Sequence, residues 1–174
     1  MPSISWLRTW LRQYFELFVV KESSFIIREA TQSDEFLIAE HLCHIALELG
    51  VSTESIRQDW LDQTVKFIDR ARHELQYKGF IAEINDQVIG SASCQLLELY
   101  PRVSREYQKG YIWGVYVVPS FRRKGVATKL MKKAMAHLKA IGCTKAVLHA
   151  SHEGKLLYSN LGYTESNEMV FSLI

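Results

Sequence analysis

The segment 111–128, with the sequence YIWGVYVVPSFRRKGVAT, constrains the fold of this chain most strongly. Its β-branched and aromatic residues predict a strand over 110–118, which Pro119 ends. Apolar residues at helical spacing then predict a helix over 126–141, with Gly142 as its stop. A strand that leads directly into a helix is typical of an α/β architecture.

The turn between this strand and this helix predicts an anion site. The first N–H groups of a helix have no partner within the helix, and the helix dipole adds positive potential there. Gly125 allows a positive φ or a close approach of a ligand to the backbone, and Ala127 is small for a similar reason. Arg122, Arg123 and Lys124 add positive charge. Taken alone, R-x-x-G-x-A is equally compatible with an ordinary basic connection, and the chain contains neither G-x-x-x-x-G-K-[ST] nor G-x-G-x-x-G.

The other patterns predict a mixed order of strands and helices. We expect further strands over 25–30, 80–84, 88–99, 145–150 and 169–173, and further helices over 31–49 and 155–160. Another helix, capped by Ser52 or Thr53, should include Ile56, Trp60, Val65 and Ile68 among its apolar positions. The strands over 110–118 and 145–150 should run parallel, because one helix crosses over between them.

Two motifs in this order resemble the GNAT acetyltransferase superfamily. Arg122-x-x-Gly125-x-Ala127 is similar to the family's [RQ]-x-x-G-x-[GA], and Leu157-Tyr158-x-x-x-Gly162-Tyr163 to its L-Y-x-x-x-G-[FY]. The resemblance extends over about residues 25–173. It implies that 25–174 form a single α/β domain with a mixed, mostly antiparallel central sheet flanked by helices.

The resemblance implies acetyl transfer from acetyl-CoA, as cosubstrate, to a primary amine by direct attack. A backbone N–H at about Val117 or Val118 would stabilise the negative thioester oxygen of the transition state. Tyr158 would donate a proton to the leaving thiolate, although its position also fits simple core packing. The residues that would hold the CoA phosphates are Arg122, Arg123, Lys124, Gly125, Val126, Ala127 and Thr128.

The general base departs from the family pattern. Many members carry a carboxylate on the strand before the motif, but 112–114 here read Ile-Trp-Gly. Glu98, His149 or a chain of waters could take the proton, and both side chains have structural readings as well. This departure raises the alternative of a non-catalytic acyl-CoA-binding or sensing module.

The segment 1–24 is expected to be an amphipathic helical extension, because Leu7, Leu11, Tyr14 and Phe18 recur at helical spacing. Its charged residues argue against a membrane span, and it lacks the pattern of a signal peptide. We expect it to pack on the domain or on a second subunit. A helix lying in a membrane interface, which would dock the enzyme there, is the alternative.

Composition limits the remaining function classes. A net charge of +2 gives no reason to expect nucleic acid or an acidic membrane as a partner. Three widely spaced cysteines predict no disulfide framework and favour the cytoplasm. His41, Cys43 and His44 lack further ligands at suitable spacing, so we expect no metal. The acceptor is expected to be an amine-bearing small molecule or peptide, since Trp60, Glu98, Tyr100 and Tyr107 fall on elements that should form its cleft. Dimers are common in the family, so a homodimer is compatible with the resemblance.

Overall fold

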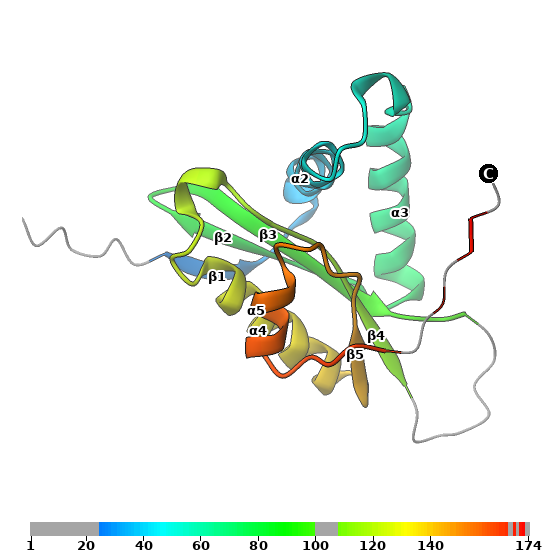
Figure 1. Ribbon diagram of the computed structural model, residues 1–174, viewed down its shortest axis with the longest axis vertical. Helices are drawn as coiled ribbons and strands as arrows, with labels where there is room; N and C mark the ends of the chain where they lie inside the picture. The colour runs from blue at the N-terminus through cyan, green and yellow to red at the C-terminus, as the bar shows by residue number, and fades with distance from the viewer. Residues whose placement is uncertain (1–24, 100–107, 167–168, 170, 173–174) are drawn as a thin grey trace, which may run out of the picture.

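The computed structural model describes residues 25–99, 108–166, 169 and 171–172. The expected N-terminal extension over 1–24 lies outside these residues, as does most of the expected loop over 101–109. Five strands form one sheet with helices on both faces (Figure 1). This arrangement confirms the expected single α/β domain with a mixed, mostly antiparallel sheet.

The described elements follow the predicted order closely. The strands are β1 Ile26–Glu29, β2 Lys78–Ile84, β3 Gln87–Leu96, β4 Lys109–Val117 and β5 Lys145–Val147. The helices are α2 Glu35–Glu48, α3 Trp60–Glu74, α4 Val126–Ala140 and α5 Lys155–Asn160, with short 3-10 turns η1 Gln32–Asp34, η2 Thr53–Ser55 and η3 Pro119–Phe121.

The sheet has the strand order β1-β2-β3-β4-β5. Each pair of neighbours from β1 to β4 is antiparallel. β5 runs parallel to β4, as the helical crossover predicted. Asn85 and Asp86 have φ of +48° and +60° and join β2 to β3 in a tight hairpin, a conformation that Asn and Asp tolerate better than most residues.

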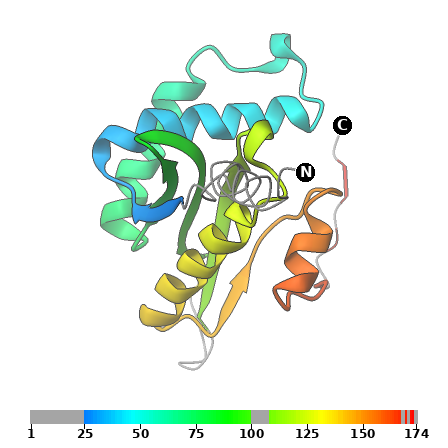
Figure 2. The same ribbon diagram turned by 90° about the vertical axis from the view of Figure 1, so that its left-hand side faces the viewer.

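Each face of the sheet has its own core. On one face α4 buries Val126, Leu130, Met131, Ala134 and Leu138 against β2, β3 and β4. On the other face α2 and α3 bury residues such as Ile38 and Ile68 against the sheet. The two views show α4 on one side of the sheet and α2 and α3 on the other (Figures 1 and 2). The apolar stripe predicted for 126–141 is therefore the packed face of α4.

A bulge at Gly114 changes which side chains of β4 face which helices. The register passes from Ser93 opposite Trp113 to Ser91 opposite Tyr116, and Gly114 has φ +61°, which favours glycine. Trp113 packs in the core under α2 and α3, so strict alternation would place Val115 there too. Instead Val115 and Val117 pack on the α4 side, and Tyr116 stacks against His41 and His44 of α2.

Three sequence-based boundaries differ from the structure. The helix expected from Ser52 or Thr53 begins at Trp60, because Ser52 precedes only the short turn η2 and Ile56 is extended. β3 ends at Leu96 instead of residue 99, and β5 ends at Val147 instead of residue 150. The closing strand expected over 169–173 lies partly outside the described residues. The members that are described, Met169, Phe171 and Ser172, do not belong to a strand.

Candidate active site

The turn between β4 and α4 has the backbone geometry of an anion site. Arg123 has φ +62°, and Gly125, which caps the 15-residue helix α4, has φ +78°. Left-handed residues in a turn direct neighbouring N–H groups to one side, and the helix N-terminus adds a positive partial charge. Residues other than glycine rarely adopt positive φ, so the backbone of this turn is strained at Arg123.

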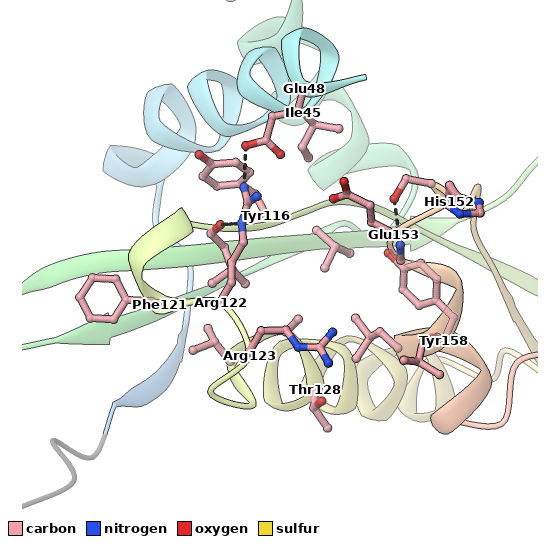
Figure 3. A pocket seen from close by; sticks show the side chains of 18 of the residues that line it. Ile45, Glu48, Tyr116, Phe121, Arg122, Arg123, Thr128, His152, Glu153 and Tyr158 are labelled. Carbon is pink, nitrogen blue, oxygen red and sulfur yellow. Dashed lines mark hydrogen bonds and ion pairs between the residues drawn. The ribbon is translucent and has the colours of Figure 1, made fainter. Parts of the chain in front are cut away.

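The turn forms one wall of a cavity of about 620 Å³. The end of α2 contributes Ile45, Glu48 and Leu49, and the end of β4 contributes 115–117. The remaining wall comes from residues 151–154, which precede α5, and from α5 itself (Figure 3). Three segments that are distant in sequence, 45–49, 115–128 and 151–160, therefore meet around one cavity at the N-terminus of α4.

The cavity opens where β4 and β5 part. The two strands pair over Lys109–Tyr111 and Lys145–Val147, after which β4 continues to Val117 and the chain leaves β5 for α5. The backbone N–H of Val118 donates to Ile89 O on β3 at 3.0 Å. Successive residues of a strand direct their peptide groups to opposite edges, so Val117 N–H and C=O point away from β3, toward the edge that β5 has left.

The structure brings most of the expected phosphate-binding residues to the cavity. Its lining includes Val117, Arg122, Arg123, Gly125, Val126, Ala127 and Thr128. Two expected residues are not in the lining. Val118 uses its N–H within the sheet, as described above, and the Lys124 ammonium donates to Ser120 O at 3.1 Å and lies 5.2 Å from the centre of the Phe121 ring. The Val118 N–H therefore bonds within the sheet, and the Lys124 side chain bonds within the turn.

Arg122 engages three groups of the protein at the cavity edge. Its Nε donates to Val117 O at 2.8 Å, and its Nη2 pairs with Oε1 of Glu48 on α2 at 2.5 Å (Figure 3). Its guanidinium carbon lies 5.7 Å from the centre of the Tyr116 ring. The hydrogen bond to Glu48 raises the pKa of Arg122 above its ordinary value, so the side chain remains charged.

Tyr158 lies on α5, across the cavity from Arg123 (Figure 3). Its ring packs on Gly154, where an added Cβ would come within 2.8 Å of the ring, and meets the Tyr163 ring edge-on at 5.9 Å. Burial raises the pKa of Tyr158, because the phenolate would lose its hydration. The side chain is therefore a neutral phenol that can donate a hydrogen bond into the cavity.

The two expected bases occupy different places. Glu98 is exposed and follows Leu96, which pairs with Gly110 at the end of β4 remote from Val117, so the structure does not bring Glu98 to the cavity. His149 follows β5, and its Nδ1 lies 2.5 Å from the hydroxyl oxygen of Tyr111 on β4. Tyr111 is the last residue of β4 that pairs with β5 and is adjacent to Gly110, so this pair also lies toward the end of β4 remote from Val117, and neither residue is in the cavity lining.

Sequence reasoning did not identify Tyr111, Tyr116, Glu48 or Glu153. Tyr111 could have been found from the parallel register, since its pairing with Val147 places it close to His149. Glu48 carries no local signal, because its contact with Arg122 joins residues 74 positions apart. Figure 3 shows Glu153 facing the cavity from the loop before α5.

The histidines of α2 form no metal centre with the residues that the structure describes. His41 Nδ1 lies 2.8 Å from Ser91 Oγ, and the His41 and His44 rings both lie against Tyr116. Among described residues, no three His, Cys, Asp or Glu side chains are grouped so that they could hold a metal ion. In the same part of the chain, no helix has the length and apolar character needed to cross a membrane.

Residues 6–163 match the family model described as the acetyltransferase (GNAT) family. The chain belongs to this family, which confirms the resemblance seen in its motifs. The match begins within the segment expected to be an N-terminal extension.

Two relatives of this chain have different acceptor groups in their names. N-alpha-acetyltransferase 30 of Xenopus laevis is 29% identical over 93 residues, which cover 52% of this chain and 33% of that protein. The chain thus spans about a third of that relative. Aminoglycoside N(6')-acetyltransferase type 1 of Acinetobacter haemolyticus is 23% identical over 139 residues, covering 72% and 96%. A solved structure described as a predicted acetyltransferase with acetyl-CoA, from Clostridium acetobutylicum, shares the fold, with a TM-score of 0.75, 22% identity and coverage of 86% and 96%.

Proposed function

We propose that the protein is an N-acetyltransferase that transfers an acetyl group from acetyl-CoA to a primary amine by direct attack. The observation that carries this proposal is the position of the turn over 122–128. Its anion-binding backbone faces the same cavity as Val117 N–H and Tyr158. A ligand with phosphates at one end and a thioester at the other fits this distribution of groups.

In the proposed complex the CoA phosphates lie at the N-terminus of α4. The N–H groups from Arg123 to Thr128 and the Arg123 side chain, which extends into the cavity in Figure 3, would bind them. The pantetheine arm would lie in the opening that β5 leaves and bring the thioester to Val117 N–H.

The reaction would use one backbone donor and one phenol. The amine nitrogen attacks the thioester carbon, and the negative oxygen that forms accepts a hydrogen bond from Val117 N–H. When the C–S bond breaks, the sulfur takes a proton from Tyr158. The new C–N bond is an amide, and the proton lost by the amine goes to a base.

We assign the base to His149, acting with Tyr111. Tyr111 lies six residues before Val117 on β4, so the proton of the amine would reach the imidazole through a chain of waters. With Nδ1–H donating to the Tyr111 hydroxyl oxygen, the lone pair of Nε2 is free to take the proton. Glu98 lies near the same end of β4, and the choice of His149 over Glu98 rests on the contact of His149 with Tyr111. Residues 112–114 offer no carboxylate, which leaves the base to a residue outside this strand.

The acceptor is proposed to be a primary amine on a peptide or small molecule. The two named relatives point to a protein α-amine and to an aminoglycoside amine respectively. An α-amino group has an ordinary pKa of about 7.7–8.0, against about 10.4 for lysine, so more of it is uncharged and nucleophilic at neutral pH. Peptides with free N-termini are therefore the first acceptors to test.

The test is release of free CoA from acetyl-CoA, followed with a thiol reagent. Peptides with free or blocked N-termini, an aminoglycoside and a simple diamine are compared, and mass spectrometry of the acceptor locates the acetyl group. Release that depends on an amine and leaves it acetylated supports the proposal. Failure on every amine, with acetyl-CoA bound, would favour the alternative of a non-catalytic acyl-CoA-binding module, which the lack of a carboxylate at 112–114 motivates.

A further inference from the structure

We infer that the Arg122 side chain is an internal brace that positions α2 and the end of β4, and that it is not a ligand of the CoA phosphates. The inference rests on the proposed function, because it concerns the same cavity. It deepens that proposal by separating the roles of two adjacent arginines. The motif itself assigns both to the same phosphate site.

Two nitrogens of the Arg122 guanidinium donate to groups of the protein. Nε binds Val117 O, which fixes the residue whose own N–H points to the opening beside β5. Nη2 binds Glu48, in the last turn of α2. The planar guanidinium also lies over the Tyr116 ring, a favourable arrangement for a cation.

Contacts around the Tyr116 ring also join α2 to β4. His41 and His44 of α2 stack on this ring at 4.6 and 5.7 Å between centres, and Arg122 lies 5.7 Å from its centre. Ile45, Glu48 and Leu49 at the end of α2 then form one wall of the cavity. Arg122 therefore links this wall directly to Val117, in addition to the histidine contacts.

The distribution of charge also supports different roles for Arg122 and Arg123. Glu48 neutralises Arg122, and Glu153 also faces this end of the cavity, so little net positive charge remains for a phosphate. Arg123, one residue later, has the opposite character, since its positive φ directs the side chain into the cavity. One exposed ion pair contributes little on its own, but three contacts of one planar group fix its orientation.

The brace predicts a specific pattern of effects. Loss of either Arg122 or Glu48 should loosen both the end of α2 and the end of β4, while the phosphate turn stays intact. CoA affinity should therefore change less than about threefold, whereas kcat falls about tenfold or more, because Val117 is no longer held in place. Since both residues act through one contact, the double variant should lose about as much as either single variant.

The test compares Arg122→Gln, Glu48→Ala, the double variant and Arg123→Gln, with Lys139→Gln at the far end of α4 as a control for lost charge. Calorimetry gives the Kd for CoA, and hydrogen exchange on the ligand-free protein follows 45–49 and 116–118. We expect faster exchange in both segments for Arg122→Gln and Glu48→Ala but not for Arg123→Gln, which should instead weaken CoA binding about tenfold. With an acceptor identified, kcat gives the third readout.

Two results would overturn the brace. One is a large loss of CoA affinity in Arg122→Gln together with tighter binding in Glu48→Ala, as expected if Glu48 competes with phosphate for Arg122. The other is unchanged exchange at 45–49 in both variants. Neither depends on turnover, so they are distinct from failure of the proposed function, which would appear as a wild-type protein that does not bind CoA or does not acetylate amines.

Discussion

Tyr111 and His149 meet where β4 and β5 begin to part, with the tyrosine oxygen 2.5 Å from Nδ1 of the histidine. Tyr111 belongs to β4, His149 follows the end of β5, and both lie beside the last register pair, Tyr111 with Val147. Because β4 carries no carboxylate at 112–114, we propose His149 as the base that receives the proton of the amine through waters.

His149→Gln should lower kcat about a hundredfold with little change in the Kd for CoA, because the amine then lacks a base. Steady-state rates with the identified acceptor, together with calorimetry of CoA binding, provide the measurement.

Tyr111→Phe should cause a smaller loss, because the hydroxyl orients the imidazole and does not accept the proton itself. His73→Gln, an exposed change on α3, serves as the control for loss of a histidine. An unchanged kcat in His149→Gln would exclude this assignment of the base.

Tyr158→Phe should lower kcat about tenfold to a hundredfold, because the thiolate leaves without a proton donor. Burial raises the pKa of Tyr158 above its ordinary value of 10.0. The phenol should therefore stay protonated below pH 10, and its ionisation should not lower wild-type activity in that range. The ring still packs on Gly154, so the melting temperature should stay close to that of the wild type. Equal kcat values for the two proteins, measured with the true acceptor, would contradict the role of this phenol.

Arg123→Gly should weaken CoA binding without lowering the free energy of unfolding. Glycine removes the strain of φ +62°, which costs about 1 kcal/mol for other residues, although its own flexibility offsets part of the gain. Stability should therefore be unchanged or slightly higher, while CoA binding weakens about tenfold. Gln76→Gly is the matched control, because Gln76 has φ +51° and lies outside the cavity lining. Equal CoA affinity in both variants would show that Arg123 does not bind phosphate.

Stability should depend on the protonation of His41, which is buried against Ser91 and Tyr116. Burial, with a smaller effect of His44, lowers the pKa of His41 from 6.5 to about 4. Between these values the unfolded chain binds a proton that the folded chain does not, so the free energy of unfolding should fall as the pH drops from 6.5 toward 4. The full loss is about 3 kcal/mol, and above pH 6.5 this contribution is constant.

Urea unfolding at a series of pH values measures this dependence. His41→Asn can keep a hydrogen bond to Ser91 without titrating, so its stability should vary less over the same range. The pKa of Asp34 is lowered by Arg28 from 3.8 to about 2, so its effect appears at lower pH and does not overlap. If the free energies of unfolding of the variant and the wild type change equally with pH, His41 is not buried as a neutral imidazole.

Local patterns predicted the part of the site that is continuous in sequence. The strand, the turn around Gly125 and the helix after it are set by neighbouring residues, and the helix over 155–160 coincides with α5. The parallel pairing of β4 and β5 followed from chain connectivity. These features depend on propensity and handedness, which a sequence discloses directly.

The remaining features depend on tertiary register. Gly114 within a β-prone run allows a bulge, but only its partner strand shows that the bulge moves Val115 to the α4 side. The contact of Arg122 with Glu48 joins distant elements, so the motif alone indicated a phosphate ligand. The absence of a carboxylate at 112–114 was visible in the sequence, whereas the meeting of Tyr111 with His149 required the structure.

The most direct test of the acetyl-CoA site is calorimetric titration of acetyl-CoA into wild type, Gly125→Asn, Gly125→Asp and Gly142→Asp. Asn and Asp have the same shape and both tolerate positive φ, and an added Cβ meets no atom within 4 Å at either glycine. Gly142 follows the other end of α4 and controls for strain alone. We predict that Gly142→Asp binds like the wild type, that Gly125→Asn binds more weakly, and that Gly125→Asp loses binding through repulsion of the phosphates. Equal binding by all four proteins, or none by the folded wild type, would contradict an acetyl-CoA site at this turn.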